Sequence, residues 1–285
     1  MRRCAFLTMD SVDAFVTYDH LLHDPLAARG WAVDDVSWRS ADVDWNMYEA
    51  VVVRSPWDYH SDPERFFAVL ETIDRSSARL ENLLVLVRWN LCKTYLRELE
   101  ARGLPIVPTR WLDRLDTDIL AANFDALGSD ELVVKPVIGA NADDTFRLRR
   151  DVPTTDALTA LADRACMVQP FVRAVVDEGE FSLFYFGEAF SHAILKTPAP
   201  LDFRVQEEHG GSIRAITPGP ELRAVSDAVM AALAPRPLYA RIDFVRLDTG
   251  FALMEVELIE PSLYFPYDDT SPDRFADAFV ARMDG

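Results

Sequence analysis

Three carboxylates in the C-terminal part of the chain are of the kind that binds a divalent cation. Asp243, Glu255 and Glu257 lie within residues 239–258, where polar and apolar residues alternate as in two half-buried strands joined by a turn. If these carboxylates face one another across the two strands, their like charges destabilise the sheet. A hard cation between them is then favoured, most naturally Mg²⁺ bound together with a phosphate. The alternative is a solvated acidic face on an acidic protein.

The pairing of these carboxylates depends on the turn between the two strands. We expect a three-residue loop at residues 248–250, with its glycine in the left-handed conformation, so that Leu247 pairs with Phe251. Asp243 then lies directly opposite Glu255. The same register pairs Arg241 with Glu257 and sends four apolar residues to the other face, namely Ile242, Phe244, Met254 and Val256.

Two lysines occupy positions from which they could bind an anion. Lys135 ends an apolar strand at residues 132–136 and precedes a loop of small residues, and a buried ammonium must be paired or bound to an anion. Lys93 lies in the first turn of a helix expected at residues 91–100, where the helix dipole disfavours a cation. Contact with an anion would explain that placement, and a solvated side chain is the alternative.

Composition limits the class of protein. The chain has 285 residues, 49% of them hydrophobic, and a formal net charge of −18. These values favour a soluble globular protein and argue against nucleic-acid binding, which needs clustered Lys and Arg. No apolar run is long enough to span a membrane. Cys4, Cys92 and Cys166 lack metal-binding spacing and suggest a reducing compartment, so we expect a cytoplasmic protein.

The N-terminal third has the alternation of strands and helices that is typical of a parallel sheet. We expect strands at residues 3–8, 32–37 and 50–54 and a helix at 18–29. Loops at the carboxyl ends of such strands bind ligands, so the segment after the third strand is a candidate substrate surface. Its candidate residues are Arg54, Ser55, Trp57 and Asp58. The alternative is a turn around a buried tryptophan.

Period-two patterns dominate from residue 131 onward. They predict a hairpin at residues 180–196, followed at 197–212 by a lightly structured stretch with the composition of an active-site loop. Amphipathic patterns predict helices at residues 63–75, 220–233 and 272–283.

Taken in order and spacing, these features resemble the ATP-grasp superfamily, in particular the branch of bacterial glutathione synthetase and the cyclising ligase of D-cycloserine biosynthesis. The match runs from about residue 90 to residue 263. Its parts are Lys93, the strand end Val134-Lys135-Pro136, the hinge Gln169-Pro-Phe171, Gly179-Glu180, Lys196, Arg204, the pair Gly210-Gly211, Asp243, Glu255 and Glu257.

The resemblance implies ATP as co-substrate and two Mg²⁺ ions, which Mn²⁺ could replace. The lysines would contact the phosphates, residues 169–172 the adenine and Glu180 the ribose. The implied nucleotide-binding residues are Lys93, Lys135, Gln169, Pro170, Phe171, Val172 and Glu180, and the metal ligands are Asp243, Glu255 and Glu257. The implied catalytic residues are Lys196, Arg204 and Arg241. The resemblance also adds three residues to the candidate substrate-binding residues, namely Gly210, Gly211 and Ser262.

Three positions depart from the pattern of the family. Glu257 stands where the last metal ligand is commonly Asn, which adds a negative charge that Arg241 would compensate. The loop after Lys135 has fewer glycines than usual. Ser182 stands where glutathione synthetase has a basic residue, which argues against glutathione chemistry.

The expected fold is α/β, with an α+β C-terminal half. As an ATP-grasp fold it would have an N-terminal parallel-sheet domain (1–88), a central lid subdomain (89–165) and a C-terminal antiparallel-sheet subdomain (166–285). The implied function is ADP-forming ligation of a carboxylate to an amine or thiol, through an acyl phosphate, on a small amino-acid-like substrate. Two alternatives stay open: an intramolecular cyclase of the D-cycloserine-forming type, and a nucleotide-binding protein without catalysis. We expect no nucleic-acid or membrane partner, and a homodimer.

Overall fold

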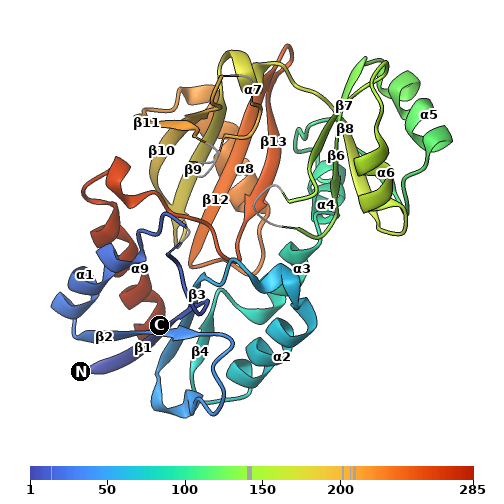
Figure 1. The fold of residues 1–285 in the computed structure, drawn as a ribbon. Coiled ribbons are helices and arrows are strands. Elements are labelled where there is room, and N and C mark those ends of the chain that lie inside the picture. The colour runs from blue at the N-terminus through green and yellow to red at the C-terminus, as the bar shows by residue number, and fades with distance from the viewer. Residues whose placement is uncertain (14, 140–142, 201, 206, 208–209) are drawn as a thin grey trace.

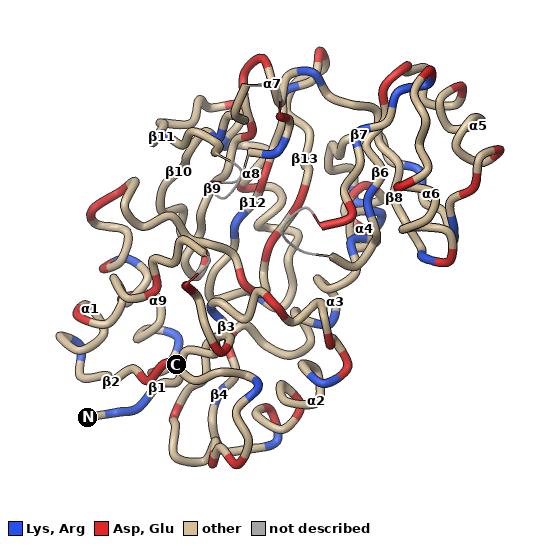
Figure 2. Tube along the Cα trace, viewed as in Figure 1, with Lys and Arg blue, Asp and Glu red and all other residues tan. Residues whose placement is uncertain are grey.

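Three sheets form the frame of the protein in a computed structural model (Figure 1). The structure describes residues 1–13, 15–139, 143–200, 202–205, 207 and 210–285. In the described part of the chain no helix is long and apolar enough to cross a membrane. Acidic and basic residues are distributed over all three sheets and their helices, and both signs occur on the strands at the centre of the molecule (Figure 2).

The N-terminal sheet is parallel, as expected. Its strand order is β2 (Trp31–Ser37), β1 (Arg2–Thr8), β3 (Ala50–Ser55) and β4 (Arg79–Glu81). Its helices are α1 (His23–Ala28) and α2 (Pro63–Asp74). The side chain of Asp62 caps α2 by accepting a hydrogen bond from the Arg65 amide, and Pro63 supplies the favoured first position. The helix expected at 18–29 is divided, because a 3₁₀ turn (Asp19–Leu22) precedes α1.

The helical connection to the next sheet differs from the expected one. A helix that was not expected, α3 (Leu84–Leu91), comes first, and α4 (Tyr95–Ala101) follows after a break. Lys93 lies in this break, before the first turn of α4, so its predicted place inside a helix is wrong. The break has a local cause, because Cys92 is extended and the Lys93 amide donates a hydrogen bond to the carbonyl of Val137 (2.8 Å).

The middle sheet has four antiparallel strands and carries Lys135. Its order is β5 (Arg110–Leu112), β8 (Cys166–Pro170), β6 (Glu131–Pro136) and β7 (Phe146–Arg149). Two helices, α5 (Thr117–Leu127) and α6 (Thr155–Leu161), share its hydrophobic core. Leu120 and Phe124 of α5 pack there with Leu132 and Val134 of β6.

The C-terminal sheet has five antiparallel strands. Its order is β11 (Ser212–Ile216), β10 (Ala189–Thr197), β9 (Glu180–Phe186), β12 (Tyr239–Leu247) and β13 (Gly250–Glu257). The helices of this region are α7 (Ala174–Asp177), α8 (Pro220–Ala232) and α9 (Ser271–Asp284). One core cluster joins this sheet to the N-terminal one, with Phe6 of β1 packed among Phe184, Phe275 and Phe279.

The turn of the β12–β13 hairpin is tighter than expected. Leu247 pairs with Gly250, so the loop has two residues and the predicted three-residue loop is wrong. The register then shifts by one residue between Phe244 and Asp243, because Met254 has no partner on β12. Such a bulge adds one residue to one strand and leaves the pairing beyond it offset.

This bulge restores the expected register at the carboxylates. Asp243 pairs with Glu255 and Arg241 pairs with Glu257, as the sequence predicts. It also changes the side on which Met254 lies. Met254 lines the cavity described below, so its expected place on the apolar face is wrong.

Candidate active site

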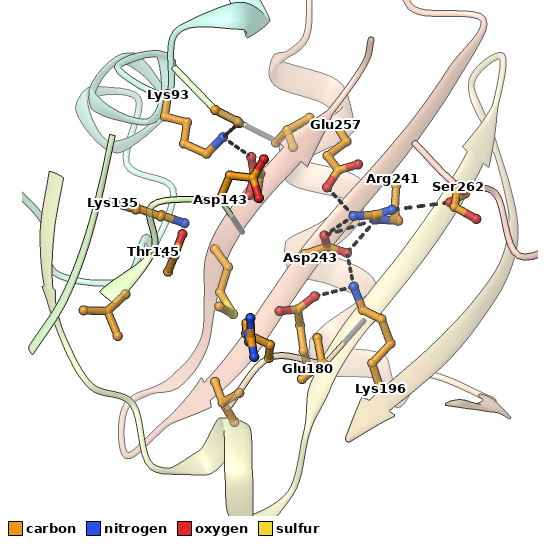
Figure 3. Close-up of a pocket in the computed structure, with 18 of the residues that line it drawn as sticks. Lys93, Lys135, Asp143, Thr145, Glu180, Lys196, Arg241, Asp243, Glu257 and Ser262 are labelled. Carbon is orange, nitrogen blue, oxygen red and sulfur yellow. Dashed lines mark hydrogen bonds and ion pairs between the residues drawn. The ribbon is translucent and has the colours of Figure 1, made fainter. Parts of the chain in front are cut away.

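A cavity of about 240 Å³ lies where the three sheets meet. The N-terminal domain contributes Trp57 and Tyr59, the middle sheet contributes Lys135, and the C-terminal sheet contributes Lys196 and Asp243. Figure 3 shows Lys93 and Lys135 on one side of this space, with Glu180, Lys196, Arg241 and Asp243 opposite them. The cavity therefore collects charged side chains from segments far apart in the sequence.

The β9–β10 hairpin brings one buried lysine to two acids. Lys196 is 3% exposed and forms an ion pair with Glu180, and its Nζ lies 3.7 Å from Oδ1 of Asp243. The hydroxyl of Ser182 donates a hydrogen bond to the same carboxylate. Burial raises the pKa of Glu180, with Lys196 opposing the shift. For Asp243 burial acts in the same direction, but Arg241 and Lys196 outweigh it and lower the pKa.

Arg241 joins two of the predicted metal ligands. Its guanidinium lies 3.1 Å from Oδ2 of Asp243 and forms an ion pair with Glu257. It also donates a hydrogen bond to the backbone carbonyl of Ser262 (3.4 Å). Burial raises the pKa of Glu257 to about 7, despite Arg241, with Asp243 and Glu255 adding to the shift. Arg241 therefore compensates the extra acid only in part.

The two lysines opposite have different surroundings. Lys93 Nζ lies 2.8 Å from Oε1 of Glu255 and donates to the carbonyl of Gly139 (2.8 Å). Burial lowers the pKa of Lys93, but Glu255 outweighs this and raises it. The ammonium group of Lys135 forms no ion pair or hydrogen bond with any residue that the structure describes, and burial lowers its pKa. Lys135 is thus the cation whose charge is less compensated.

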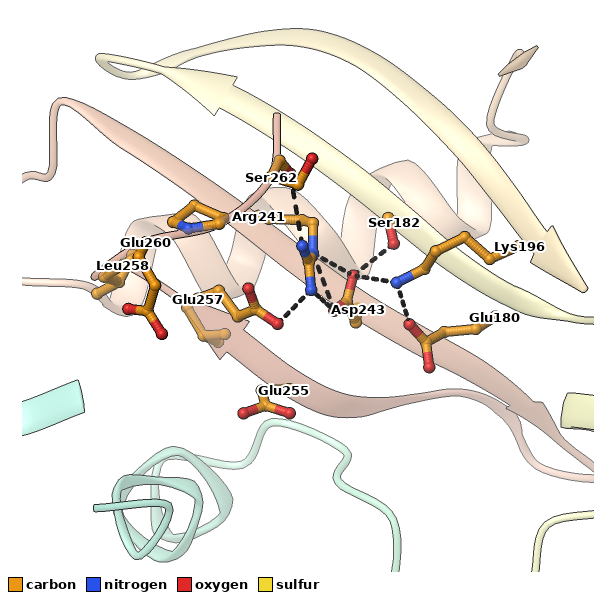
Figure 4. Close-up of polar contacts among 12 residues, drawn as sticks. Glu180, Ser182, Lys196, Arg241, Asp243, Glu255, Glu257, Leu258, Glu260 and Ser262 are labelled. Carbon is orange, nitrogen blue, oxygen red and sulfur yellow. Dashed lines mark hydrogen bonds and ion pairs between the residues drawn. The ribbon is translucent and has the colours of Figure 1, made fainter. Parts of the chain in front are cut away.

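The three predicted metal ligands share one face of the hairpin, as Figure 4 shows, but they do not form a ready cluster. Within the described ranges no three His, Cys, Asp or Glu side chains are arranged to hold a metal ion. Asp243 and Glu257 bind Arg241, and Glu255 binds Lys93. Carboxylate oxygens suit Mg²⁺, and burial raises the pKa of Glu257 even though Arg241 is paired with it, so a further cation would stabilise these acids and the donor set fits a hard cation.

The C-terminal end of β13 is held by side chains from α3 and α4. The Tyr95 hydroxyl accepts a hydrogen bond from the Val256 amide (2.8 Å) and donates to the Val256 carbonyl (2.9 Å). Asn90 donates to the same carbonyl (2.7 Å) and accepts from the Leu258 amide (2.9 Å). These buried bonds fix the backbone between Glu255 and Glu257.

The predicted adenine-binding segment also lines the cavity, at the end of β8. Gln169 donates a hydrogen bond to the Thr109 hydroxyl (2.9 Å). The ring of Phe171 packs against Phe203, and the guanidinium of Arg147 lies 3.7 Å from its centroid. The segment's cavity-lining residues are Gln169, Pro170, Phe171 and Val172.

The remaining predicted residues divide into two groups. Arg204, Trp57 and Ser262 line the cavity, and Arg204 pairs with Asp202 (2.9 Å) while its side chain remains 39% exposed. The others are not among the described cavity-lining residues, namely Arg54, Ser55, Asp58, Gly210 and Gly211. Three of these have internal partners, since Arg54 binds Asp19, Ser55 binds Thr8, and Asp58 binds Trp38 and Arg39.

The cavity includes acids that the sequence analysis did not single out. Glu260 accepts a hydrogen bond from the hydroxyl of Tyr59, and Glu207 is bound by the hydroxyls of Tyr18 and Tyr267. Glu260 follows the Glu-x-Glu pair by three residues, and that spacing is the signal that could have found it. Glu207 lies in the loop at 197–212, part of which is outside the described residues.

Comparisons with known proteins identify relatives that match the whole length of the chain. The cycloserine biosynthesis protein DcsG of Streptomyces lavendulae is 33% identical, over 97% of this chain and 98% of that protein. The crystal structure of D-cycloserine synthetase DcsG superposes with a TM-score of 0.86 at 30% identity, covering 99% of both chains. The family model for the N-terminal domain of D-cycloserine synthetase DcsG matches residues 4–82.

More distant relatives share the fold. The glutathione synthetase of Ralstonia nicotianae is 27% identical over 84% of this chain and 72% of its own length. The RimK domain ATP-grasp protein of Sphaerobacter thermophilus has a TM-score of 0.71 at 16% identity, over 98% of this chain and 99% of that one. The expected ATP-grasp fold, with its parallel and antiparallel sheets, is therefore confirmed.

These findings define the class first: the protein is an ADP-forming ligase with the ATP-grasp fold. A relative at 33% identity then matches it over nearly the whole length of both chains. The chain accordingly belongs to the family of D-cycloserine synthetase DcsG.

Proposed function

We propose that the protein uses ATP to close a ring within one small amino-acid-like substrate, through an acyl phosphate. The observation that carries the proposal is the gathering of cations and carboxylates from three sheets in one cavity. These residues are Lys93, Lys135, Lys196, Arg204 and Arg241, with Asp243, Glu255 and Glu257. Such a set stabilises a transferring phosphoryl group rather than supplying a side-chain nucleophile.

The nucleotide would lie between the middle and C-terminal sheets. Residues 169–172 would contact the adenine and Glu180 the ribose, while Lys93 and Lys135 would hold the phosphates. Asp243, Glu255 and Glu257 would hold two Mg²⁺ ions, or Mn²⁺ in their place, once Arg241 and Lys93 turn toward the phosphates. Bound Mg²⁺ would neutralise charge on the phosphate oxygens.

The chemistry divides into two displacements. A carboxylate oxygen of the substrate attacks the γ-phosphorus, the bond from that phosphorus to ADP breaks, and an acyl phosphate forms. A nitrogen of the same substrate then attacks the acyl carbon, the bond to phosphate breaks, and the nitrogen loses a proton. Lys196 and Arg204 would stabilise the charge on the transferring group.

Ring closure is preferred to ligation of two molecules because the full-length relatives are named for cycloserine biosynthesis. Ligation to a separate amine or thiol is the second candidate, supported by the glutathione synthetases. The test is to incubate the protein with Mg-ATP and a library of small amino-acid derivatives, measuring ADP release and product mass. We expect one derivative alone to support ADP release and to give a product made only of its own atoms. A requirement for a second amine or thiol would favour ligation, and no ADP with any derivative would refute the proposal.

A further inference from the structure

Glu260 is held in the cavity wall by two aromatic residues of the N-terminal domain. Its backbone carbonyl accepts a hydrogen bond from Nε1 of Trp57 (2.8 Å), and its carboxylate is bound by the hydroxyl of Tyr59. Both aromatic side chains are buried, with exposed fractions of 8% and 4%. The position of the Glu260 carboxylate is therefore fixed by contacts outside its own loop.

This carboxylate differs from its neighbours because it has no cationic partner among the described residues. Glu180 binds Lys196, Glu255 binds Lys93, and Glu257 binds Arg241. Figure 4 shows Glu260 beyond Glu257, at the end of the row away from Lys196. Burial and the charge of Glu257 raise the pKa of Glu260 to about 8. A partly buried carboxylate of this kind is stabilised by a positive charge brought by a ligand.

The surroundings of Glu260 suit an organic cation. Phe15, Trp57 and Tyr59 line the same end of the cavity, and the rings of Phe15 and Trp57 lie 5.3 Å apart. Aromatic faces attract ammonium groups and exclude water from them. A metal ion would instead need several oxygen ligands at this end.

We propose that Glu260 binds the protonated amino group of the substrate, with Tyr59 positioning the carboxylate and the aromatic residues closing around the ammonium. This inference rests on the proposed ring closure and adds a specificity-determining residue to it. The substrate class is then a small molecule that carries a free ammonium group besides the two groups that react.

Glu207 is the competing acid in the cavity. Its carboxylate already accepts hydrogen bonds from the hydroxyls of Tyr18 (3.1 Å) and Tyr267 (3.1 Å). Two neutral donors satisfy a carboxylate better than the one hydroxyl on Glu260, so the remaining capacity to bind a cation is greater at Glu260.

The test compares two rings that differ only in the amino group. D-Cycloserine and isoxazolidin-3-one, the same ring without the amine, are titrated into the protein with ADP and Mg²⁺ present, and the dissociation constants are measured by calorimetry. We expect the wild-type protein to prefer D-cycloserine by about tenfold or more, the scale of a hydrogen bond to a charged group. Glu260→Gln should remove this preference, and Tyr59→Phe should reduce it.

Two controls make the result specific. Glu207→Gln should keep the preference, and the ADP affinity of Glu260→Gln should match wild type, which shows that the variant is folded. Equal binding of both rings by wild type, or a preserved preference in Glu260→Gln, would overturn this inference alone. Binding of neither ring by wild type would contradict the ring-closure proposal and this inference with it.

Discussion

At the scale of single residues, the cavity contains cations of two kinds. Lys93 and Lys196 are ion-paired with Glu255 and Glu180, so in the proposed nucleotide complex each would exchange a carboxylate for a phosphate. Lys135 has no such partner in the described part of the chain, and burial lowers its pKa. A cation in that position gains the most from an incoming anion.

We therefore predict that Lys135→Met weakens Mg-ATP binding by about 2–4 kcal/mol, the scale for removing one partner of a desolvated charge pair. The melting temperature without nucleotide should stay the same or rise, because an uncompensated, partly buried charge is removed. Calorimetric titration and thermal unfolding measure the two effects.

Lys93→Met is the matched control, since it leaves Glu255 without its ion-pair partner. It should lower the free energy of unfolding by about 1–3 kcal/mol. Unchanged nucleotide affinity in both variants would show that these lysines have only a structural role.

The raised pKa of Glu260 predicts that the free energy of unfolding depends on pH. Its pKa is raised from 4.5 to about 8 in the folded protein, so the folded state binds this proton more tightly than the unfolded chain. The stability that this group contributes is present at low pH and is lost as the pH rises from about 5 to 8. Glu260→Gln should therefore be more stable than wild type at pH 8, and the difference should shrink toward pH 5.

Urea unfolding at several pH values measures this effect. Glu188→Gln is the control, because Glu188 is 73% exposed and its pair with Arg236 contributes little. A wild-type protein whose stability relative to Glu260→Gln is the same at pH 5 and pH 8 would contradict the raised pKa.

At the scale of elements, the β12–β13 hairpin shows what the sequence can predict. Alternation of polar and apolar residues identified both strands, and the pairing of Asp243 with Glu255 is confirmed. The loop length was wrong by one residue, and the bulge at Met254 compensates for it. Neither feature has a local signal, because a two-residue turn with a bulge and a three-residue turn without one lead to the same pairing.

The ion-pair partners of these carboxylates also could not be predicted from the sequence. Residue spacing brings Asp243, Glu255 and Glu257 to one face, but it does not say that Arg241 and Lys93 bind them. Lys93 comes from a break between two helices whose position depends on a hydrogen bond to Val137, a residue far along the chain. Tertiary contacts of this kind override local helix propensity.

Tyr95 holds the end of β13 that carries two of the proposed metal ligands. Tyr95→Phe removes the partner of the buried Val256 amide, so we predict a loss of about 1–3 kcal/mol in the free energy of unfolding. Because Val256 lies between Glu255 and Glu257, the rate of ATP turnover should also fall.

Tyr185→Phe is the matched control for this prediction. Its hydroxyl bonds Ser226 and Asp227 of α8, so it should lose stability without losing turnover relative to folded protein. Chemical unfolding and steady-state ADP release distinguish the two variants. Normal turnover in Tyr95→Phe would mean that the strand end does not position the carboxylates.

At the scale of the whole molecule, the N-terminal domain contributes residues to the cavity and packs against the C-terminal sheet. It shares a core cluster with the C-terminal sheet, and Trp57 binds the loop that carries Glu260. We propose the domain boundary near residue 88, but we predict that a chain lacking residues 1–88 does not fold. Removal would expose Phe184, Phe275 and Phe279.

Near-UV circular dichroism and thermal unfolding of the truncated chain, compared with the full chain, measure this dependence. We expect no cooperative transition and no Mg-ATP binding. Cooperative melting together with nucleotide binding would show that the remainder folds on its own.

The central claim is that one substrate is activated as an acyl phosphate and then closes on itself. The direct measurement uses the substrate that supports ADP release, with ¹⁸O placed in its carboxylate. The label is followed by mass spectrometry during a single turnover. We predict ADP, labelled inorganic phosphate and a cyclic product with the atoms of one substrate, because the bridging oxygen leaves with phosphorus. Label retained in a stable phosphorylated product, or AMP and pyrophosphate in place of ADP and phosphate, would contradict the account.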